Sequence, residues 1–501
     1  MAVVSAGPRS GPAPGAHFFC TAGRGLEPFL MREVRERLAA TQVEYISGKV
    51  FFTTCSDLNM LKQLKSAERL FLLIKKQLPF PVSSVSKGKI FNELQRLIND
   101  DPESWLNAIS IWKNLLELDA KKEKLSHKNA NPLKRKVGED DITAKKLKTE
   151  QIQDIQETKE CQLEKQIEEK ILEQGNFITE GEKFQELQND VTEAVDTRNQ
   201  TNLTFRVSCR CSGAIAKTIT AQEVGRVIGI TLMKQFGWKA DLRNPNLEIF
   251  IHLSDIYSVL GIPVFRVPLA CRAYIKTAGL RSTIAWAMAS LAEIKAGAVV
   301  LDPMCGLGTI LLEAAKEWPD VYYVGADVSD SQLSGAHDNL RAAGLEDKIE
   351  LLKVSVTELP LPSESIDIII SDIPFGKKFK LGKDIKRTLQ EMERVLRVGG
   401  TIVLLLSEDH HKRLKGGEAR SGPLNSQGGH TEEPGGEECL TPAEKAAVSE
   451  PVPSSFAAGN QECLDGMPPL GSLVPVDCYR VSLGKTDALI SKYKKAYSPG
   501  R

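Results

Sequence analysis

The stretch VVLDPMCGLGT, residues 299–309, decides the fold. It begins as a short apolar run, turns at two glycines, and leads into ILLEAAKEW, which has a helical pattern. Gly306 and Gly308 allow positive φ angles and a close approach of backbone to a ligand. A phosphate-binding loop needs GxGxxG or a GK[ST] ending, and neither is present, so we expect no dinucleotide or nucleoside triphosphate. Such a glycine turn also occurs as a purely structural connection from strand to helix, and that alternative stays open.

Four more apolar runs follow in the same region: YYVGADV, IELLKVS, IDIIISD and TIVLLLS. They alternate with helical segments, and they are apolar throughout rather than at every second residue. That pattern is typical of a parallel sheet covered by helices on both faces. We therefore predict an α/β fold of the Rossmann-like type, in which ligands bind at the carboxyl ends of the strands.

An acidic residue closes the second of these strands. Asp327 is well placed to accept hydrogen bonds from two ribose hydroxyls, as the corresponding acid does in dinucleotide folds. The alternative is an N-cap for the next helix, a position that Ser329 or Asp330 could also fill. The stretch KVSVTELPL, with Ser355 at the end of its strand, fits the wall around an adenine ring.

A polar corner follows the fourth strand, in IDIIISDIPFG, residues 366–376. The isoleucines read as buried core, and their strand delivers Asp372, Pro374 and Phe375 to the carboxyl edge of the sheet. A carboxylate there can accept an N–H bond from an aromatic amine. Pro374 fixes the backbone φ angle and with it the direction of the neighbouring carbonyl, that of Ile373 or of Pro374 itself. Phe375 offers a flat face on which a base taken out of its stack can lie.

The bulk composition excludes several classes. A chain of 501 residues predicts two to four domains, and 65 basic against 65 acidic residues confine any nucleic-acid surface to a local patch. The scattered cysteines have no zinc spacing, so we expect no metal; Cys209 and Cys211 favour side-by-side packing over a redox or metal pair. No secretory signal and no apolar run of about 18 residues is present, so we expect an intracellular protein without a membrane span.

The motif pair DPMCGLGT and SDIPFG resembles the class I S-adenosylmethionine-dependent methyltransferases that methylate exocyclic amino groups. Upstream, HFFCTAGRGLEPFLMREV, GKVFFTT and LKSAERLFLLI resemble the N-terminal ferredoxin-like domain of RNA methyltransferases that carry a THUMP domain. Residues from about 200 to 267, closing with VLGIPVFRVPLACRAY, resemble the THUMP domain itself. Nearly all the ordered chain is thus similar to the THUMP-containing guanosine N2-methyltransferases, which act on structured RNA.

This resemblance implies a domain plan. The segments are a disordered N-terminus at 1–16, a ferredoxin-like domain at 17–119, a charged and partly helical linker at 120–198, a THUMP domain at 199–267 and a methyltransferase domain at 268–501 with a disordered insertion at 412–472. Within the linker, KRK at 134–136 and KKLK at 145–148 resemble a two-part nuclear import signal. A solvated charged linker explains them equally well, so nucleus and cytoplasm both remain open.

The resemblance also implies the reaction and its residues. The methyl donor would be S-adenosylmethionine and the product N2-methylguanosine in a transfer RNA or small nuclear RNA. The corner of Asp372, Pro374 and Phe375 would hold the guanine amine, and a small zinc-binding activator subunit would be the protein partner. The implied cofactor residues are Asp302, Met304, Gly306, Gly308, Asp327 and Ser355. Cys305 reads as packing rather than as a nucleophile.

Two positions depart from the pattern of the family. Ser355 stands where many relatives have an acid that meets the adenine amino group, and Ile373 replaces the first proline of the usual Pro-Pro pair. Three alternatives stay open: an inactive RNA-binding scaffold, and methyltransferases that act on protein glutamine or on adenine N6, which share the acid-Pro-aromatic corner. The tandem upstream modules argue against the last two.

RNA capture would fall to the first two domains. Structured RNA is read mainly by shape and by its backbone, so cations matter more than base-reading groups. The candidate phosphate contacts are Arg206, Arg210, Lys217 and Arg226. Each of these side chains can equally be a solvated surface charge.

Overall fold

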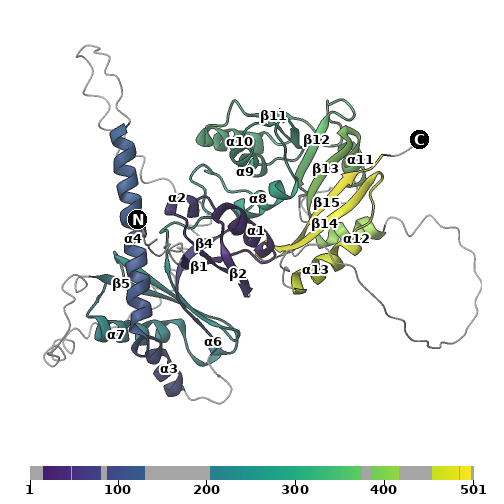
Figure 1. Cartoon of the computed structure of the whole chain (residues 1–501). Coiled ribbons are helices and arrows are strands. Elements are labelled where there is room, and N and C mark those ends of the chain that lie inside the picture. The colour runs from purple at the N-terminus through teal and green to yellow at the C-terminus, as the bar shows by residue number, and fades with distance from the viewer. Residues whose placement is uncertain are drawn as a thin grey trace, which may run out of the picture. The chain divides into compact units, whose positions relative to one another are not determined.

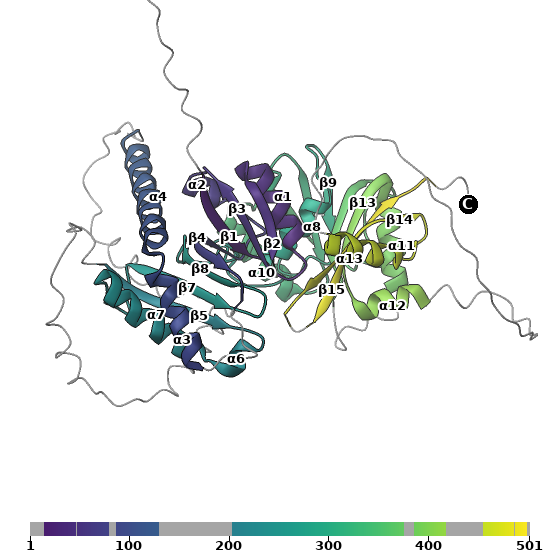
Figure 2. The ribbon, with the colours of Figure 1, turned by 60° about the horizontal axis from the view of Figure 1, so that its bottom comes forward.

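The computed structural model describes residues 15–46, 48–79, 87–129, 203–374, 385–416, 454–484 and 486–497 (Figures 1 and 2). The chain divides into two compact units, Met1–Gly23 with Phe29–Ala278, and Arg24–Pro28 with Gly279–Arg501. We call these the N-terminal and the methyltransferase unit. No helix within the described ranges is both long enough and apolar enough to cross a membrane.

The N-terminal unit begins with the expected ferredoxin-like order of elements. These are β1 (Ala16–Thr21), α1 (Glu27–Leu38), β2 (Thr41–Ile46), β3 (Lys49–Thr54), α2 (Leu58–Leu61) and β4 (Arg69–Gln77). The strands lie in the order β2-β3-β1-β4, and every neighbouring pair is antiparallel. The sequence DLNMLKQLKSAERLFLLIKKQL, residues 57–78, predicts a long helix that runs into a strand. The helix is instead short, because α2 ends at Leu61 and an irregular segment leads to β4.

The THUMP segment continues the same sheet. The remaining elements are α3 (Lys87–Asn99), α4 (Pro102–Asn129), β5 (Thr204–Cys211), α6 (Ile215–Thr218), α7 (Ala221–Phe236), β6 (Lys239–Ala240), β7 (Leu247–Leu253) and β8 (Ser258–Pro263). Strand β8 pairs antiparallel with β4, which gives one eight-stranded sheet in the order β2-β3-β1-β4-β8-β7-β5-β6. Two segments that the sequence separates by a long linker therefore share one backbone hydrogen-bond ladder.

The two faces of this sheet differ, because successive strand residues point to opposite sides. One face carries the main core, in which residues such as Phe18, Leu72 and Ile251 pack against the apolar sides of the helices. The other face carries an aromatic cluster. There Phe19 stacks on Phe71 with ring centroids 4.7 Å apart.

The methyltransferase unit is a seven-stranded sheet with helices. Its elements are α8 (Ser282–Leu291), β9 (Val299–Asp302), α9 (Thr309–Glu317), β10 (Tyr322–Asp327), α10 (Asp330–Ala343), β11 (Ile349–Lys353), β12 (Ile366–Asp372), α11 (Ile385–Val395), β13 (Leu396–Ser407), α12 (Glu408–Gly416), α13 (Ser454–Asp465), β14 (Leu473–Ser482) and β15 (Asp487–Lys495). The strand order is β11-β10-β9-β12-β13-β15-β14. The first five strands are parallel, and β15 enters antiparallel to β13.

This order places a topological switch point between β9 and β12. From β9 the chain moves outward through β10 to β11 and then returns to the other side of β9. Ligands of open α/β sheets bind outside the carboxyl ends of the strands at such a point. Alternating residues of the central strands supply both cores: Ile369 packs with Met392 of α11, whereas its neighbours Ile368 and Ile370 face the opposite side.

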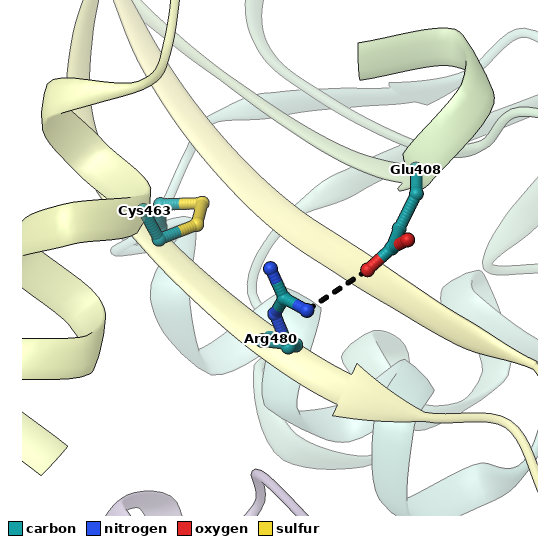
Figure 3. The surroundings of a disulfide bond; sticks show 4 residues. Glu408, Cys463 and Arg480 are labelled. Atoms are coloured by element: carbon teal, nitrogen blue, oxygen red, sulfur yellow. Dashed lines mark hydrogen bonds and ion pairs between the residues drawn. A yellow bond between two sulfur atoms is a disulfide. The ribbon is translucent and has the colours of Figure 1, made fainter. Parts of the chain in front are cut away.

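The insertion expected to be disordered from 412 to 472 is too long at its C-terminal end. Residues Ser454–Asp465 form α13, and Met467 behind it is buried. A disulfide between Cys463 and Cys478 joins α13 to β14, and Arg480 further along β14 pairs with Glu408 at 2.9 Å (Figure 3). The prediction failed there because a Gly/Ser/Pro-rich composition hid a short helix anchored by contacts distant in sequence. Residues 417–453, the N-terminal segment 1–14 and the import-signal candidates lie outside the described ranges.

Candidate active site

Two carboxylates meet at the switch point. Asp302 ends β9 and Asp372 ends β12, and these strands are parallel neighbours with Leu301 paired to Ile369. Most residues of both strands before these carboxylates are apolar and buried in the core of the sheet. The register thus brings the two motif stretches to one edge, as the sequence predicts.

Asp302 is a buried carboxyl at the base of the site, 1% exposed. Its Oδ1 accepts hydrogen bonds from the Met304 amide at 3.2 Å and from the Ser371 hydroxyl at 3.0 Å. Burial raises the pKa of Asp302 to about 8, and the charges of Asp372 and Asp327 add to the rise. Ser371 is fully buried and was not singled out from the sequence, because a serine inside a strand carries no signal of its own.

The conformation of the glycine turn is fixed by its φ angles and by hydrogen bonds of its backbone amides. Gly306 and Gly308 have φ angles of +52° and +76°, a region that favours glycine. The Gly306 amide donates to Asp327 Oδ2 at 3.1 Å, and the Cys305 amide donates to the Ala326 carbonyl at 2.8 Å. Cys305 itself is buried, and burial raises its thiol pKa far above the usual range, which suits packing rather than nucleophilic chemistry.

Asp327 is not the N-cap of the following helix. The cap of α10 is Ser329, whose hydroxyl accepts from the Gln332 amide at 3.4 Å. Asp327 instead joins the end of β10 to the glycine turn, and its Oδ1 accepts from the Ser329 amide at 2.8 Å. The next residue, Val328, is 64% exposed, so an apolar surface lies directly beside the carboxylate. The sequence reasoning missed this valine, although its place after a strand-end acid was a usable signal.

Asp372 has a buried oxygen, Oδ1, that makes no hydrogen bond to any of the described residues. Burial raises the pKa of this carboxyl to about 7. The next residue, Ile373, is fully buried, and its amide donates to the Leu405 carbonyl at 3.1 Å. The sheet thus still holds the chain at Ile373, the residue before Pro374. Phe375 lies outside the described residues.

The hydroxyl groups of Ser355 and Thr309 differ in whether they have a hydrogen-bond partner among the described residues. Ser355 lies two residues after β11 and is engaged locally, with its hydroxyl 2.9 Å from that of Thr357 and accepting from the Thr357 amide at 3.3 Å. Thr309, at the start of α9, has a buried hydroxyl with no hydrogen-bond partner within the described ranges. We did not single out Thr309 from the sequence, although it closes the glycine stretch.

The four candidate RNA contacts do not form one group. Arg206 pairs with Glu248 of β7 at 2.8 Å, so its charge already has a partner. Arg210 is exposed on the same strand, β5. Arg226 lies on α7, which covers the opposite face of the sheet, and Lys217 lies on the short helix α6. Cys209 and Cys211 both pack against the main core, and burial raises the Cys209 pKa to about 12.

Known proteins match the chain over its whole length. Residues 270–415 match the family described as RMKL-like, methyltransferase domain, and residues 182–261 match the THUMP domain. A Bos taurus protein named U6 snRNA (guanine-N(2))-methyltransferase THUMPD2 is 93% identical over 501 residues, covering all of both chains. The Homo sapiens protein of that name is 76% identical over 495 residues, 98% of both chains. The chain belongs to the THUMP-domain guanine-N2-methyltransferase family.

The fold of this family is also seen in solved structures. The crystal structure of TrmN from Thermus thermophilus aligns with 96% of this chain and 99% of that chain at a TM-score of 0.56 and 18% identity. That likeness concerns the fold alone. Together with the two family matches, it confirms the predicted architecture of a THUMP domain followed by a class I methyltransferase fold.

Proposed function

We propose that the protein uses S-adenosylmethionine to form N2-methylguanosine in U6 snRNA. The family membership supports the reaction, and the names of the two relatives support this RNA over a transfer RNA. The single observation that carries the chemistry is the buried Oδ1 of Asp372 at the switch point, which has no hydrogen-bond partner in the described part of the chain. A buried acceptor without a partner is costly, so its persistence indicates a ligand donor.

The residues around the glycine turn fit the methyl donor. The positive-φ glycines keep the approach to the turn free of side chains, Asp327 ends the second strand where ribose hydroxyls would donate, and exposed Val328 beside it fits an adenine face. The unpartnered hydroxyl of Thr309 offers a further polar contact. When bound, S-adenosylmethionine supplies a methyl group already activated on a sulfonium. The chain therefore contributes placement and electrostatics rather than activation.

The guanine amine is the group that needs help, because its lone pair is delocalised into the ring. Asp372 Oδ1 is positioned to accept one N–H of that amine. A backbone carbonyl of Ile373 or Pro374 would accept the other, and the hydrogen bond from the Ile373 amide to Leu405 anchors the backbone directly before these carbonyls. Holding both hydrogens in this way favours a pyramidal nitrogen, whose lone pair is less delocalised into the ring and can be directed at the methyl group. Once N2 carries the methyl group it becomes acidic, and the ionised Asp372 is the nearest group to take the proton.

The departures from the usual motif are compatible with this role. Ile373 is fully buried where relatives have proline, so it serves the core while Pro374 keeps the turn. Because the Ser355 hydroxyl is engaged with Thr357, recognition of the adenine amino group would fall to backbone atoms after β11. Stacking of the target base on Phe375 remains part of the proposal.

The remaining assignments are also proposals. RNA capture would fall to the N-terminal unit, with Arg210, Lys217 and Arg226 better suited than the paired Arg206. A small zinc-binding activator subunit would be the protein partner. A substrate of the small nuclear RNA class makes the nucleus the expected location.

The test is transfer of labelled methyl groups to U6 snRNA and, in parallel, to total transfer RNA and a glutamine-containing peptide. The reaction is run with and without an activator subunit, and the product nucleoside is identified. We expect N2-methylguanosine in U6 snRNA with the wild-type protein and none with Asp372→Ala. N6-methyladenosine, peptide methylation, or full activity of Asp372→Ala would each refute the assignment. Absence of S-adenosylmethionine binding in calorimetry would favour an RNA-binding scaffold.

A further inference from the structure

A polar cavity of about 460 Å³ lies in the N-terminal unit. Its lining comes from four strands and their turns, including Lys49 of β3, Arg210 of β5, His252 of β7 and Tyr257 just before β8. None of these residues belongs to the methyltransferase unit. The volume suits a nucleotide-sized group.

Lys49 is a buried cation in the wall of this cavity, 5% exposed. Its ammonium lies 2.7 Å from His252 Nδ1 and 2.8 Å from the Tyr257 hydroxyl. An ammonium can only donate, so Nδ1 is the acceptor and Nε2 of the neutral imidazole carries the hydrogen. Nε2 then donates to the Ser212 hydroxyl, 2.9 Å away, which leaves Ser212 with its own hydrogen to give to a ligand. The network thus holds Lys49 in place and presents donors.

Arg210 is a second cation of the lining, exposed and without a carboxylate partner among the described residues. Burial is the main cause that lowers the pKa of Lys49 to about 8, and the charge of Arg210 adds to it. Burial and the charges of Lys49 and Arg210 likewise lower the pKa of His252 to about 3. Arg206 differs from Arg210 in this respect, because it lies four positions earlier on the same face of β5 and pairs with Glu248. The cavity lining therefore contains two cations, Lys49 and Arg210, and neither forms an ion pair with a carboxylate among the described residues.

The lining also contains two carboxylates, Glu68 and Asp255, and neither forms an ion pair with Lys49 or Arg210 among the described residues. Asp255 accepts from the backbone amides of Ala214 at 2.7 Å and Ile215 at 3.3 Å, so it closes the turn into α6. Glu68 also lines the cavity and has an interaction of its own. An incoming anion would meet Lys49, Arg210 and the Ser212 hydroxyl together.

We infer that this cavity binds a backbone phosphate of the RNA substrate. Lys49 and Arg210 contact the non-bridging oxygens, and Ser212 donates a further hydrogen bond. Charge-assisted bonds from lysine and arginine are the strong ones for phosphate, and backbone contacts fix the register of an RNA without reading its sequence. The inference rests on the proposed function for the identity of the anion. It assigns positioning of the RNA, and not chemistry, to this site.

The test measures binding of full-length protein to U6 snRNA and transfer RNA transcripts by fluorescence anisotropy, over salt from about 50 to 200 mM. Each variant is compared on whichever RNA the wild type binds more tightly. We expect Arg210→Ala to weaken binding and to reduce the slope of log affinity against log salt by about one, the loss of one phosphate contact. Arg210→Lys should keep most of the slope. The matched control is Arg206→Ala, which lies on the same strand face and should leave the slope unchanged.

Lys49→Met provides the second arm, because methionine keeps the length of the buried side chain and removes its charge. If the variant melts as a folded protein, its slope should also fall by about one. If it does not fold, the Arg210→Ala variant alone tests the inference, because Arg210 is exposed. A slope for Arg210→Ala equal to that of the wild type overturns the inference. Methyl transfer at saturating RNA is measured separately, so loss of the proposed reaction and loss of this site are distinguishable.

Discussion

The Ser371 hydroxyl donates a hydrogen bond of 3.0 Å to Asp302 Oδ1 and so joins the strand of the amine clamp to the strand of the cofactor turn. Both residues are buried, 0% and 1% exposed. Ser371 directly precedes Asp372, whereas Asp302 directly precedes the glycine turn. One short contact therefore sets the position of the two halves of the site relative to each other.

Ser371→Ala should impair cofactor binding more than turnover. The substitution leaves buried Asp302 with the Met304 amide as its remaining donor among the described residues, at a cost of about 1–3 kcal/mol in the free energy of unfolding. We expect KM for S-adenosylmethionine and Kd for S-adenosylhomocysteine to rise several-fold, with a smaller change in kcat. Ser371→Thr keeps the hydroxyl and should restore cofactor affinity. An unchanged KM in a folded Ser371→Ala protein would show that the contact is only structural.

The methylation rate should depend on the ionisation of Asp372. Burial raises its pKa to about 7, and only the carboxylate form accepts an amine hydrogen on either oxygen and later takes the proton. The single-turnover rate is therefore expected to rise between about pH 6 and pH 8 and then level off. Asp372→Asn should lower the rate by about 10²-fold or more and remove this rise. Asp302 is unchanged in the variant, so an inflection that persists in Asp372→Asn belongs to another group.

The same carboxyl should destabilise the free protein at alkaline pH. Its folded pKa of about 7 exceeds the unfolded value of about 3.9, so the folded state binds more protons between these values. Stability consequently falls as pH rises through this window, because folding buries a charge. Asp372→Asn removes that charge, so its Tm should exceed the wild-type Tm at pH 8 by a few degrees and match it near pH 4. Calorimetric melts at both values test the sign, and a wild-type advantage at pH 8 would contradict it.

Much of the fold was predictable because its signals are local. The apolar runs at 299–302 and 366–370 and the glycine turn between strand and helix encode a parallel sheet without reference to distant residues. The shared eight-stranded sheet was not predictable, since the pairing of β4 with β8 joins residues on either side of a long linker. Helix propensity also failed before β4, where buried Leu64 and Ala67 lie in turns rather than in a continued helix.

The site shows the same division. Asp302, Asp327 and Asp372 could be predicted because each ends an apolar strand. Ser371 and Thr309 could not be predicted, because their roles depend on contacts in the folded chain. Ser371 is buried beside Asp302, its hydrogen-bond acceptor, whereas the hydroxyl of Thr309 is buried without a hydrogen-bond partner among the described residues. The cavity around Lys49 draws on three strands besides β3, so no spacing in the sequence marks it.

The Cys463–Cys478 disulfide should stabilise the methyltransferase unit in the oxidised protein. It closes a loop with a sequence separation of 15 residues and joins α13 to β14, next to the edge of the sheet (Figure 3). Constraint of the unfolded chain by a loop of this size contributes about 3 kcal/mol. We expect dithiothreitol to lower the denaturation midpoint of the oxidised wild-type protein in urea. The Cys463→Ser, Cys478→Ser double variant should unfold at the reduced wild-type midpoint with or without reductant. A wild-type midpoint that ignores dithiothreitol would mean that the two thiols pack side by side without bonding.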